Sequence, residues 1–150
     1  MTPTIQIIFA SLSGRNQAIA MHLQAHLAAH AQTVVTEISQ ADAYAAPQAD
    51  AVILVSYTYH DGELPDEAQD FYEDLAAVDL QGTYFAVCGS SSTQHVHYGR
   101  AVDRLAQRLT EQGGMAVAPV LKIDGDPSEA DRQRLDALAA QVLTTLDSGN

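Results

Sequence analysis

Short apolar runs alternate with helix-forming segments along the whole chain, and this alternation limits the fold more than any other feature of the sequence. The expected strands are rich in apolar or β-branched residues and lie at 4–9, 33–38, 51–55, 84–88 and 115–123. The expected helices lie at 16–30, 66–76, 98–112 and 128–146, with a weakly helical, alanine-rich connection at 39–48. Strands separated by helix-length segments pair in parallel through right-handed crossovers. The sequence therefore predicts an α/β fold of three layers, in which helices cover both faces of a five-stranded parallel sheet.

Two of these runs also indicate where their strands lie in the sheet. Residues 51–55 are continuously apolar, which is typical of a central strand buried on both faces. Pro119 interrupts the last run, and its missing N–H group is tolerated at the edge of a sheet. The third run is therefore expected in the middle of the sheet, and the fifth at its edge.

The chain is long and apolar enough for one domain, spanning residues 1–150. Of its 150 residues, 47% are hydrophobic, which provides a core without disulfides or metal ions. A single cysteine, Cys88, excludes a disulfide framework within the chain. No signal peptide is apparent, and no apolar run approaches the roughly 20 residues of a membrane span, so we expect a cytoplasmic protein without a membrane partner.

Acidic residues dominate the charge of the chain. The formal net charge is −12, so nucleic acids and anionic membranes would be repelled, and a partner protein should present a basic surface. No Lys or Arg occurs between Asn16 and Gly99, whereas eight acidic residues fall between Asp61 and Asp79. Part of this acidic run is expected to be a solvated helix face.

The segment that joins the first strand to the first helix has the composition of a phosphate-binding loop. Unpaired N–H groups and the positive end of the helix dipole favour an anion at this position. Ser11, Ser13 and Asn16 add side-chain donors, Gly14 permits a close turn of the backbone, and Arg15 adds a positive charge. A serine-rich helix cap without any ligand is the alternative interpretation.

Two further loops should emerge from the same edge of the sheet. Residues 56–62 follow the third strand and are rich in aromatic residues, and residues 89–97 follow the fourth strand and are rich in glycine and serine. Because the carboxyl ends of parallel strands share one edge, the three loops should converge where the strand order reverses. Together they predict a pocket for a flat ring tethered to a phosphate.

In combination, these loops resemble the short-chain flavodoxins. The similar segments are 11–16, 57–64, 88–95 and 98–103, with a further likeness at 122–127. The resemblance implies the flavodoxin-like strand order 2-1-3-4-5 and one non-covalently bound flavin mononucleotide (FMN) at the switch point. It also implies that Tyr59 stacks on one face of the flavin, with His95 at the outer position. The cofactor-binding residues expected from the motifs are Ser11, Leu12, Ser13, Gly14, Arg15, Asn16, Tyr57, Thr58, Tyr59, His60, Cys88, Gly89, Ser90, Ser92, His95 and Gly99.

Four positions depart from the pattern of that family. Arg15 introduces a charge into a loop that is usually neutral, and His60 stands in place of a glycine. Ser92 replaces an aspartate, and His95 replaces an aromatic residue. The imidazole ring of His95 is smaller than that of tyrosine, so it buries less apolar area. We expect these differences to change FMN affinity and redox tuning more than the fold.

The resemblance implies a monomeric, low-potential electron carrier that shuttles electrons between basic-surfaced redox enzymes, namely reductases and oxidoreductases. An FMN-dependent reductase or a ribonucleotide-reductase-activating flavoprotein on the same fold is the alternative. We expect no catalytic residues, because neither Ser11 nor Ser13 lies in a G-x-S-x-G elbow. A phosphoacceptor module would need an aspartate where Ser56 stands.

Three histidines recur every four residues in the first helical segment. His22, His26 and His30 could place imidazoles on one helix face, which is a spacing that can bridge a transition metal. No carboxylate or cysteine on the same helix completes the ligand set, so the sequence favours an exposed stripe and predicts no metal site.

Overall fold

The computed structural model describes residues 2–59, 62–92 and 98–148. Its elements, in chain order, are β1 (Thr4–Phe9), α1 (Arg15–Leu27), β2 (Gln32–Glu37), η1 (Ile38–Gln40), η2 (Ala43–Gln48), β3 (Ala51–Val55), η3 (Asp66–Ala68), α2 (Gln69–Leu75), β4 (Tyr84–Ser91), α3 (Arg100–Glu111), β5 (Met115–Ala116), β6 (Leu121–Asp124) and α4 (Glu129–Ser148). The label η marks short 3-10 helices, two of which form the alanine-rich connection between β2 and β3.

The strands form one parallel sheet in the order β2-β1-β3-β4-β5, and β6 also pairs with β4. This arrangement confirms the predicted fold class and strand order. All five residues of β3 are buried, as expected for a central strand covered on both faces.

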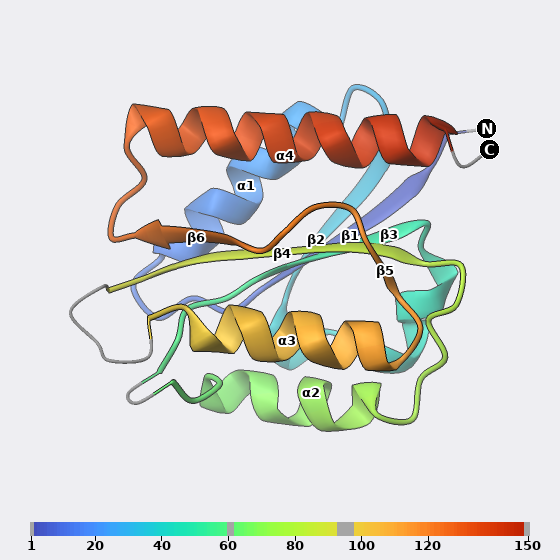
Figure 1. The fold of residues 1–150 in the computed structure, drawn as a ribbon, viewed down its shortest axis with the longest axis horizontal. Coiled ribbons are helices and arrows are strands. Elements are labelled where there is room, and N and C mark those ends of the chain that lie inside the picture. Colours follow the sequence, from blue (N-terminus) through green and yellow to red (C-terminus); the bar gives the residue numbers. More distant parts are fainter. Residues whose placement is uncertain (1, 60–61, 93–97, 149–150) are drawn as a thin grey trace.

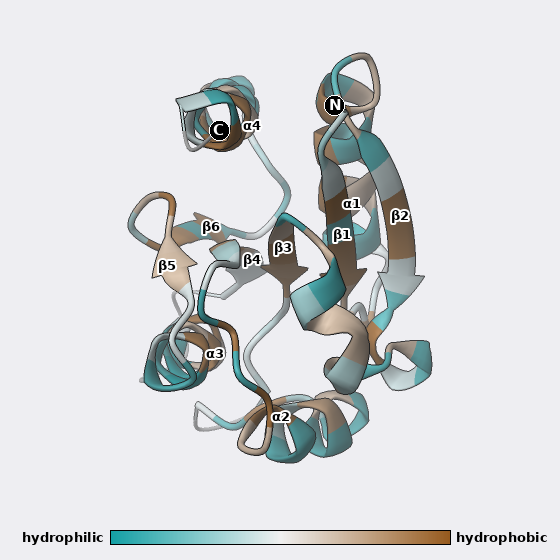
Figure 2. Cartoon of the chain, turned by 90° about the vertical axis from the view of Figure 1, so that its right-hand side faces the viewer, coloured by the Kyte–Doolittle hydropathy of each residue, from teal (hydrophilic) through white to brown (hydrophobic). Residues whose placement is uncertain are grey.

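Helices cover the sheet on both sides. The helices α1 and α4 lie on one face, and α2 and α3 lie on the other (Figure 1). Alternate residues of each strand supply the two cores, so Ile53 and Val55 pack toward α1 and α4, while Val52 and Leu54 pack toward α2 and α3. Figure 2 shows this pattern as brown central strands between helices whose outer surfaces are mostly teal.

The last strand differs from the prediction of one continuous run at 115–123. It is divided into β5 and β6, with Pro119 in the irregular segment between them. Proline lacks the N–H group that a sheet ladder needs, and the backbone leaves the sheet around it. Among the described strands, both pieces pair only with β4, so the expected edge position is confirmed.

Helix ends also refine the expected boundaries. The helix α1 ends at Leu27, so His30 lies in the turn beyond it and not on the helix. The predicted cap of α4 is confirmed, because the Asp131 N–H donates to Ser128 Oγ at 3.1 Å and the Ser128 N–H donates to an Asp131 carboxylate oxygen at 3.0 Å. Within the described residues, no helix has the length and apolarity needed to cross a membrane.

Candidate functional site

The three loops singled out by the sequence leave the sheet at one edge, opposite the beginning of β1 and the last turn of α4 (Figure 1). Backbone hydrogen bonds continue the strand pairing into these loops. The Ala10 N–H donates to the Val55 carbonyl at 2.8 Å, and the Ser56 N–H donates to the Cys88 carbonyl at 3.0 Å. The ends of β1, β3 and β4, where the three loops begin, therefore lie beside one another, as the sequence predicts.

Asn16 ties the first loop to the third. Its side-chain amide donates to the Ser90 carbonyl at 3.1 Å, and its amide oxygen accepts the Ser90 N–H at 2.7 Å. Asn16 is only 3% exposed. This side chain thus holds β4 against the start of α1, which differs from the phosphate contact expected for its amide.

The loop between β1 and α1 leaves donors free for an anion. Gly14 adopts φ 88° at the N-cap of α1, where no side chain caps the helix and no acidic residue lies in the first turn. The Ser11 Oγ atom is buried and has no hydrogen-bond partner within the described chain. Leu12 and Ser13 are exposed at the rim of the loop. A buried hydroxyl and an uncapped helix N-terminus fit a phosphate group.

Arg15 extends from the start of α1 toward the loop that precedes α4. Its Nε atom lies 3.0 Å from an Asp126 carboxylate oxygen, and Asp126 is largely exposed. Surface ion pairs of this kind contribute little to stability. Only the Nε–H of Arg15 is engaged in this contact, so the remaining guanidinium donors can still serve an anion near the loop.

The loop after β3 contains a narrow hairpin. The Tyr59 N–H donates to the Glu63 carbonyl at 2.8 Å, and the Glu63 N–H donates to the Tyr59 carbonyl at 2.8 Å. Gly62 completes the turn with φ 92°, a conformation that glycine adopts readily. This places Tyr59 at the base of the turn. His60 lies outside the described residues.

Tyr57, at the start of this loop, forms a hydrogen-bonded pair with Glu67 of η3. The Tyr57 hydroxyl donates to both Glu67 carboxylate oxygens, at 3.0 and 3.1 Å. Burial, the bond to Glu67 and the nearby charges of Glu67 and Asp66 raise the pKa of Tyr57 well above its ordinary value. The sequence did not predict that Glu67 pairs with Tyr57, because the two residues are ten positions apart.

Thr58 and Gly99 shape the junction with α3. The Ala101 N–H donates to Thr58 Oγ1 at 3.1 Å, which satisfies one of the unpaired groups in the first turn of α3. Gly99 is the N-cap of α3 with φ 68°, and a Cβ at this position would lie 2.5 Å from the side chain of Lys122. Both residues were predicted to contact the cofactor, and the structure shows them supporting the loops.

Cys88 and Gly89 are also structural. Cys88 is fully buried in the core beneath α1 and α4, and burial raises the pKa of its thiol to about 12. Its side chain therefore faces the core, so a contact of Cys88 with the cofactor would have to be made by its backbone. A Cβ on Gly89 would lie 1.7 Å from the Ser56 carbonyl oxygen, so glycine permits the close approach of β4 to the end of β3.

The serines at the end of β4 divide into two kinds. Ser90 is buried, and its hydroxyl donates to the Gly125 carbonyl, so it joins β4 to the loop after β6. Ser91, in the middle of the run of three serines, was not among the residues expected from the motifs, yet its buried Oγ has no partner within the described chain. Ser92 is half-buried at the edge, and His95 lies outside the described residues.

Two arginines of α3 lie against the acidic segment. The guanidinium carbons of Arg104 and Arg108 are 5.2 and 3.9 Å from the ring centroid of Tyr72 on α2. Arg108 also donates to the Tyr72 carbonyl at 2.5 Å. The arginines of α3 therefore place positive charge beside α2, although no Lys or Arg occurs between Asn16 and Gly99 in the sequence. Nearer the loop after β3, the acidic residues Glu63 and Asp66 are exposed.

The flavodoxin family profile matches residues 7–137. This chain belongs to the flavodoxin family. It is 33% identical to "Probable flavodoxin 2" of Bacillus subtilis (strain 168) over 137 residues, covering 87% of this chain and 88% of that protein. It is 31% identical to "Probable flavodoxin 1" of the same organism over 146 residues, covering 96% of this chain and 92% of that protein.

Solved structures agree with this assignment. The crystal structure of oxidised flavodoxin 2 from Bacillus cereus is 37% identical, with a TM-score of 0.91 and coverage of 95% of this chain and 99% of that one. Flavodoxins bind FMN, transfer electrons and act with redox partner proteins. The loops of this flavodoxin at the carboxyl edge of the sheet are therefore its candidate FMN site.

Proposed function

We propose that this flavodoxin binds one FMN non-covalently at the edge formed by the loops after β1, β3 and β4 and carries electrons between redox proteins. The single observation that supports this most strongly is the loop at 11–16, where a buried Ser11 hydroxyl and the N-terminus of α1 have no side-chain partner among the described residues. That combination suits a phosphate anion. When bound, FMN supplies the redox-active ring.

The residues of the chain have distinct roles in this proposal. The N–H groups of residues 12–16 and the hydroxyls of Ser11 and Ser13 would hold the phosphate. Tyr59, at the base of its hairpin, would cover one face of the ring and exclude water from it. Asn16 would keep the phosphate loop in register with β4 through its two bonds to Ser90.

Charge reversal in the phosphate loop tests the site. We expect Ser13→Asp to weaken FMN binding by at least about tenfold, because even in bulk water two unit charges at 4 Å repel by about 1 kcal/mol and the phosphate is a dianion. Titration of apoprotein with FMN, followed by flavin fluorescence, gives the dissociation constant. Ser13→Asn is the matched control, since it has the same shape without the charge. Equal affinity in the Asp variant and the wild type would exclude this phosphate site.

The proposed partners are proteins with basic surfaces, which meet this flavodoxin as a monomer in the cytoplasm. The net charge of −12 supports electrostatic steering of such partners. Electron transfer from a reductase should slow as salt rises, since charges are screened over about 8–10 Å. Neutralising Asp61, Glu63, Asp66 and Glu67 to amides should flatten this dependence. The control variant changes Asp70, Glu73 and Asp74 to amides. These residues lie on α2, where the arginines of α3 supply positive charge, so this variant should keep the salt dependence.

A carrier and a flavoenzyme differ in their turnover. A visible spectrum with flavin bands tests cofactor binding in the purified protein. Steady-state turnover of a reducible substrate without any added reductase would then favour an enzyme. We expect flavin bands and no such turnover, because flavodoxins are electron-transfer proteins.

A further inference from the structure

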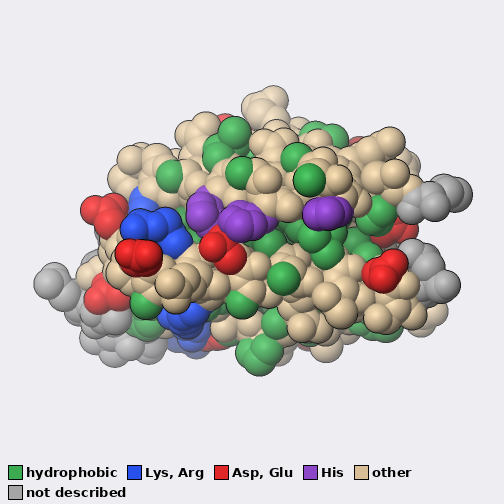
Figure 3. Space-filling model, turned by 90° about the horizontal axis from the view of Figure 1, so that it is seen from above, with side chains coloured by type: hydrophobic (Ala, Val, Ile, Leu, Met, Phe, Trp, Pro, Cys, Tyr) green, Lys and Arg blue, Asp and Glu red, His purple; other side chains and the backbone are tan. Residues whose placement is uncertain are grey.

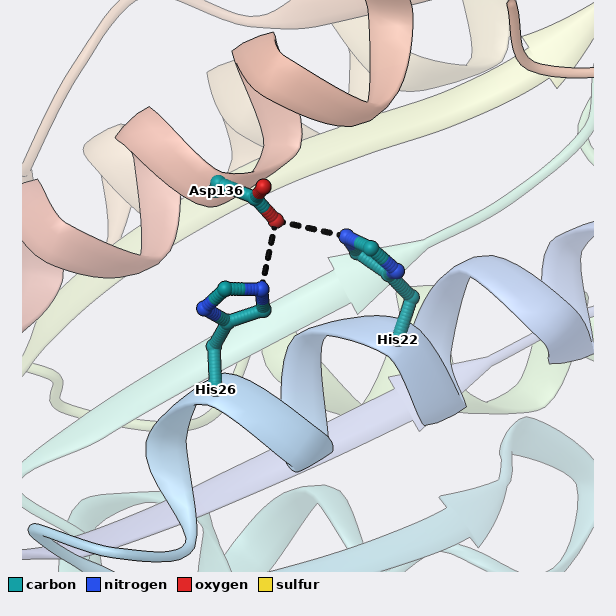
Figure 4. Close-up of side chains that lie close together, drawn as sticks. All are labelled: His22, His26 and Asp136. Carbon is teal, nitrogen blue, oxygen red and sulfur yellow. Dashed lines mark hydrogen bonds and ion pairs between the residues drawn. The ribbon is translucent and has the colours of Figure 1, made fainter. Parts of the chain in front are cut away.

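Two histidines and one aspartate form a cluster on the face of the molecule covered by α1 and α4. His22 and His26 lie one turn apart on α1, and Asp136 projects toward them from α4 (Figure 4). The Nε2 atoms of His22 and His26 lie 2.6 and 2.7 Å from the same Asp136 oxygen, Oδ1. One ligand atom from each of the three residues lies within 4.8 Å of the others.

The cores of the two helices fix this arrangement. Leu23 and Leu27 of α1 pack in the same apolar cluster as Leu135 and Ala139 of α4, and all four are buried. His22 precedes Leu23 and Asp136 follows Leu135, so the same packing that buries the leucines brings the three polar side chains together at the rim. The backbone positions of the ligands are therefore set by the fold and not by the side chains themselves.

The cluster is accessible from solvent. The side chains of His22, His26 and Asp136 are 29%, 45% and 39% exposed. The space-filling view from above shows histidines in a row across this surface, with an acidic side chain directly beside two of them (Figure 3). An ion could reach the three ligands without any opening of the fold, and the net charge of −12 attracts cations.

We propose that His22, His26 and Asp136 form a binding site for a divalent transition-metal ion of the zinc type, which bridges α1 and α4. Two imidazoles and one carboxylate suit Zn²⁺, Ni²⁺ or Cu²⁺, whereas Mg²⁺ and Ca²⁺ prefer oxygen ligands. Each histidine binds through Nε2 and carries its proton on Nδ1. Water occupies the remaining position of a tetrahedral ion.

The distances allow an ion to replace the two hydrogen bonds. Ligand atoms about 2.0 Å from a tetrahedral ion lie about 3.3 Å from one another. The observed separations of 2.6 and 2.7 Å therefore need to widen by less than about 1 Å. The ligand atoms of the two histidines, which lie within 4.8 Å of one another, need to approach by up to about 1.5 Å, and partly exposed side chains can make both adjustments by rotation. The bound ion would then link residues 110 to 114 positions apart in the chain.

Such a link joins the C-terminal helix to the helix that begins at the phosphate loop. The helices α1 and α4 already meet through their apolar faces, and Arg15 pairs with Asp126 just before α4. Since the ion binds the folded arrangement of both helices, it should raise the midpoint of thermal unfolding.

Zinc titration of the purified full-length protein tests the site. We expect calorimetry in chelator-free buffer to show one Zn²⁺ per chain, and Mg²⁺ to give no comparable binding. The variants His22→Gln, His26→Gln and Asp136→Asn should each weaken Zn²⁺ binding by about tenfold or more and remove the zinc-dependent rise in unfolding midpoint. His30→Gln is the matched control, because His30 lies beyond the end of α1, and it should leave Zn²⁺ affinity unchanged.

Three other histidines, His60, His95 and His97, provide the competing explanation for zinc binding. Zinc affinity that survives in the variant carrying both His22→Gln and His26→Gln would overturn the proposal, as would an absence of zinc binding in the wild type. If the variants fail to fold, imidazole ¹⁵N spectra of the wild type decide the matter. Zinc should shift the Nε2 signals of His22 and His26, and shifts confined to other histidines would refute the site.

Discussion

The tie between Asn16 and Ser90 leads to a quantitative prediction for the variant Asn16→Ala. The amide of Asn16 makes two hydrogen bonds to backbone groups of β4, and the residue is almost fully buried. Alanine cannot replace either bond. The N–H and carbonyl groups of Ser90, which is also buried, would then lack these partners and would have little access to water.

The expected loss of stability follows from those two groups. Each buried polar group left without a partner costs about 1–3 kcal/mol. Alanine has a better helix propensity than asparagine, and this offsets roughly 0.5 kcal/mol. We therefore expect the free energy of unfolding of the apoprotein to fall by about 2–5 kcal/mol. FMN affinity should fall as well, because the phosphate loop would lose its connection to β4.

Urea denaturation of the apoprotein and FMN titration measure the two effects. Gln24→Ala is the matched control, because Gln24 lies on the same helix and makes one bond, at 3.2 Å, to the Thr33 hydroxyl, where both partners are half-buried. We expect this control to lose less than about 1 kcal/mol and to keep its FMN affinity. An Asn16→Ala variant within about 0.5 kcal/mol of the wild type would refute the proposed role of the tie.

Two further predictions concern the strand ends and the acidic loop. Gly89→Ala should prevent folding or destabilise the protein by more than about 4 kcal/mol, because the new Cβ would collide with the Ser56 carbonyl oxygen. Gly14→Ala is the control and should cost only about 1–2 kcal/mol, which is the strain of a left-handed backbone conformation. Urea denaturation and the yield of folded protein distinguish these outcomes. Tyr57 has a raised pKa in the fold, so the unfolded chain loses this proton first as pH rises and stability falls above about pH 10. Tyr57→Phe should weaken that alkaline fall measured by denaturation, and an identical fall in both proteins would contradict the pairing of Tyr57 with Glu67.

The architecture of this flavodoxin could be predicted from the order and spacing of its apolar residues alone. Runs such as 51–55 are short and continuously apolar, whereas the helices carry apolar residues about every 3.6 positions, so each type of element could be predicted from its local sequence. The alternation of the two then left few topologies, because crossovers between parallel strands are right-handed. That topology predicts which edge of the sheet carries the loops. The composition of residues 11–16, at the start of a helix, predicts a phosphate-binding loop.

The contacts of individual residues in those loops depend on how distant segments pack. Cys88 and Gly89 matched a cofactor motif by position, yet one packs in the core and the other permits a close approach of two strands. The local sequence does not show whether a residue at the end of a strand faces the core, a neighbouring strand or the ligand site. Pro119 likewise indicated an edge but not that the strand would divide around it.

Contacts between distant segments explain the remaining differences. Asn16 meets Ser90 across 74 positions, and Asp136 completes the histidine pair of α1 from a helix more than 100 positions away. The sequence predicted no metal site, because no carboxylate or cysteine on the same helix completes a ligand set with the histidines. Local periodicity gives the face of each helix, but the packing of buried leucines sets which rims of two helices meet, and that packing depends on the whole sheet between them.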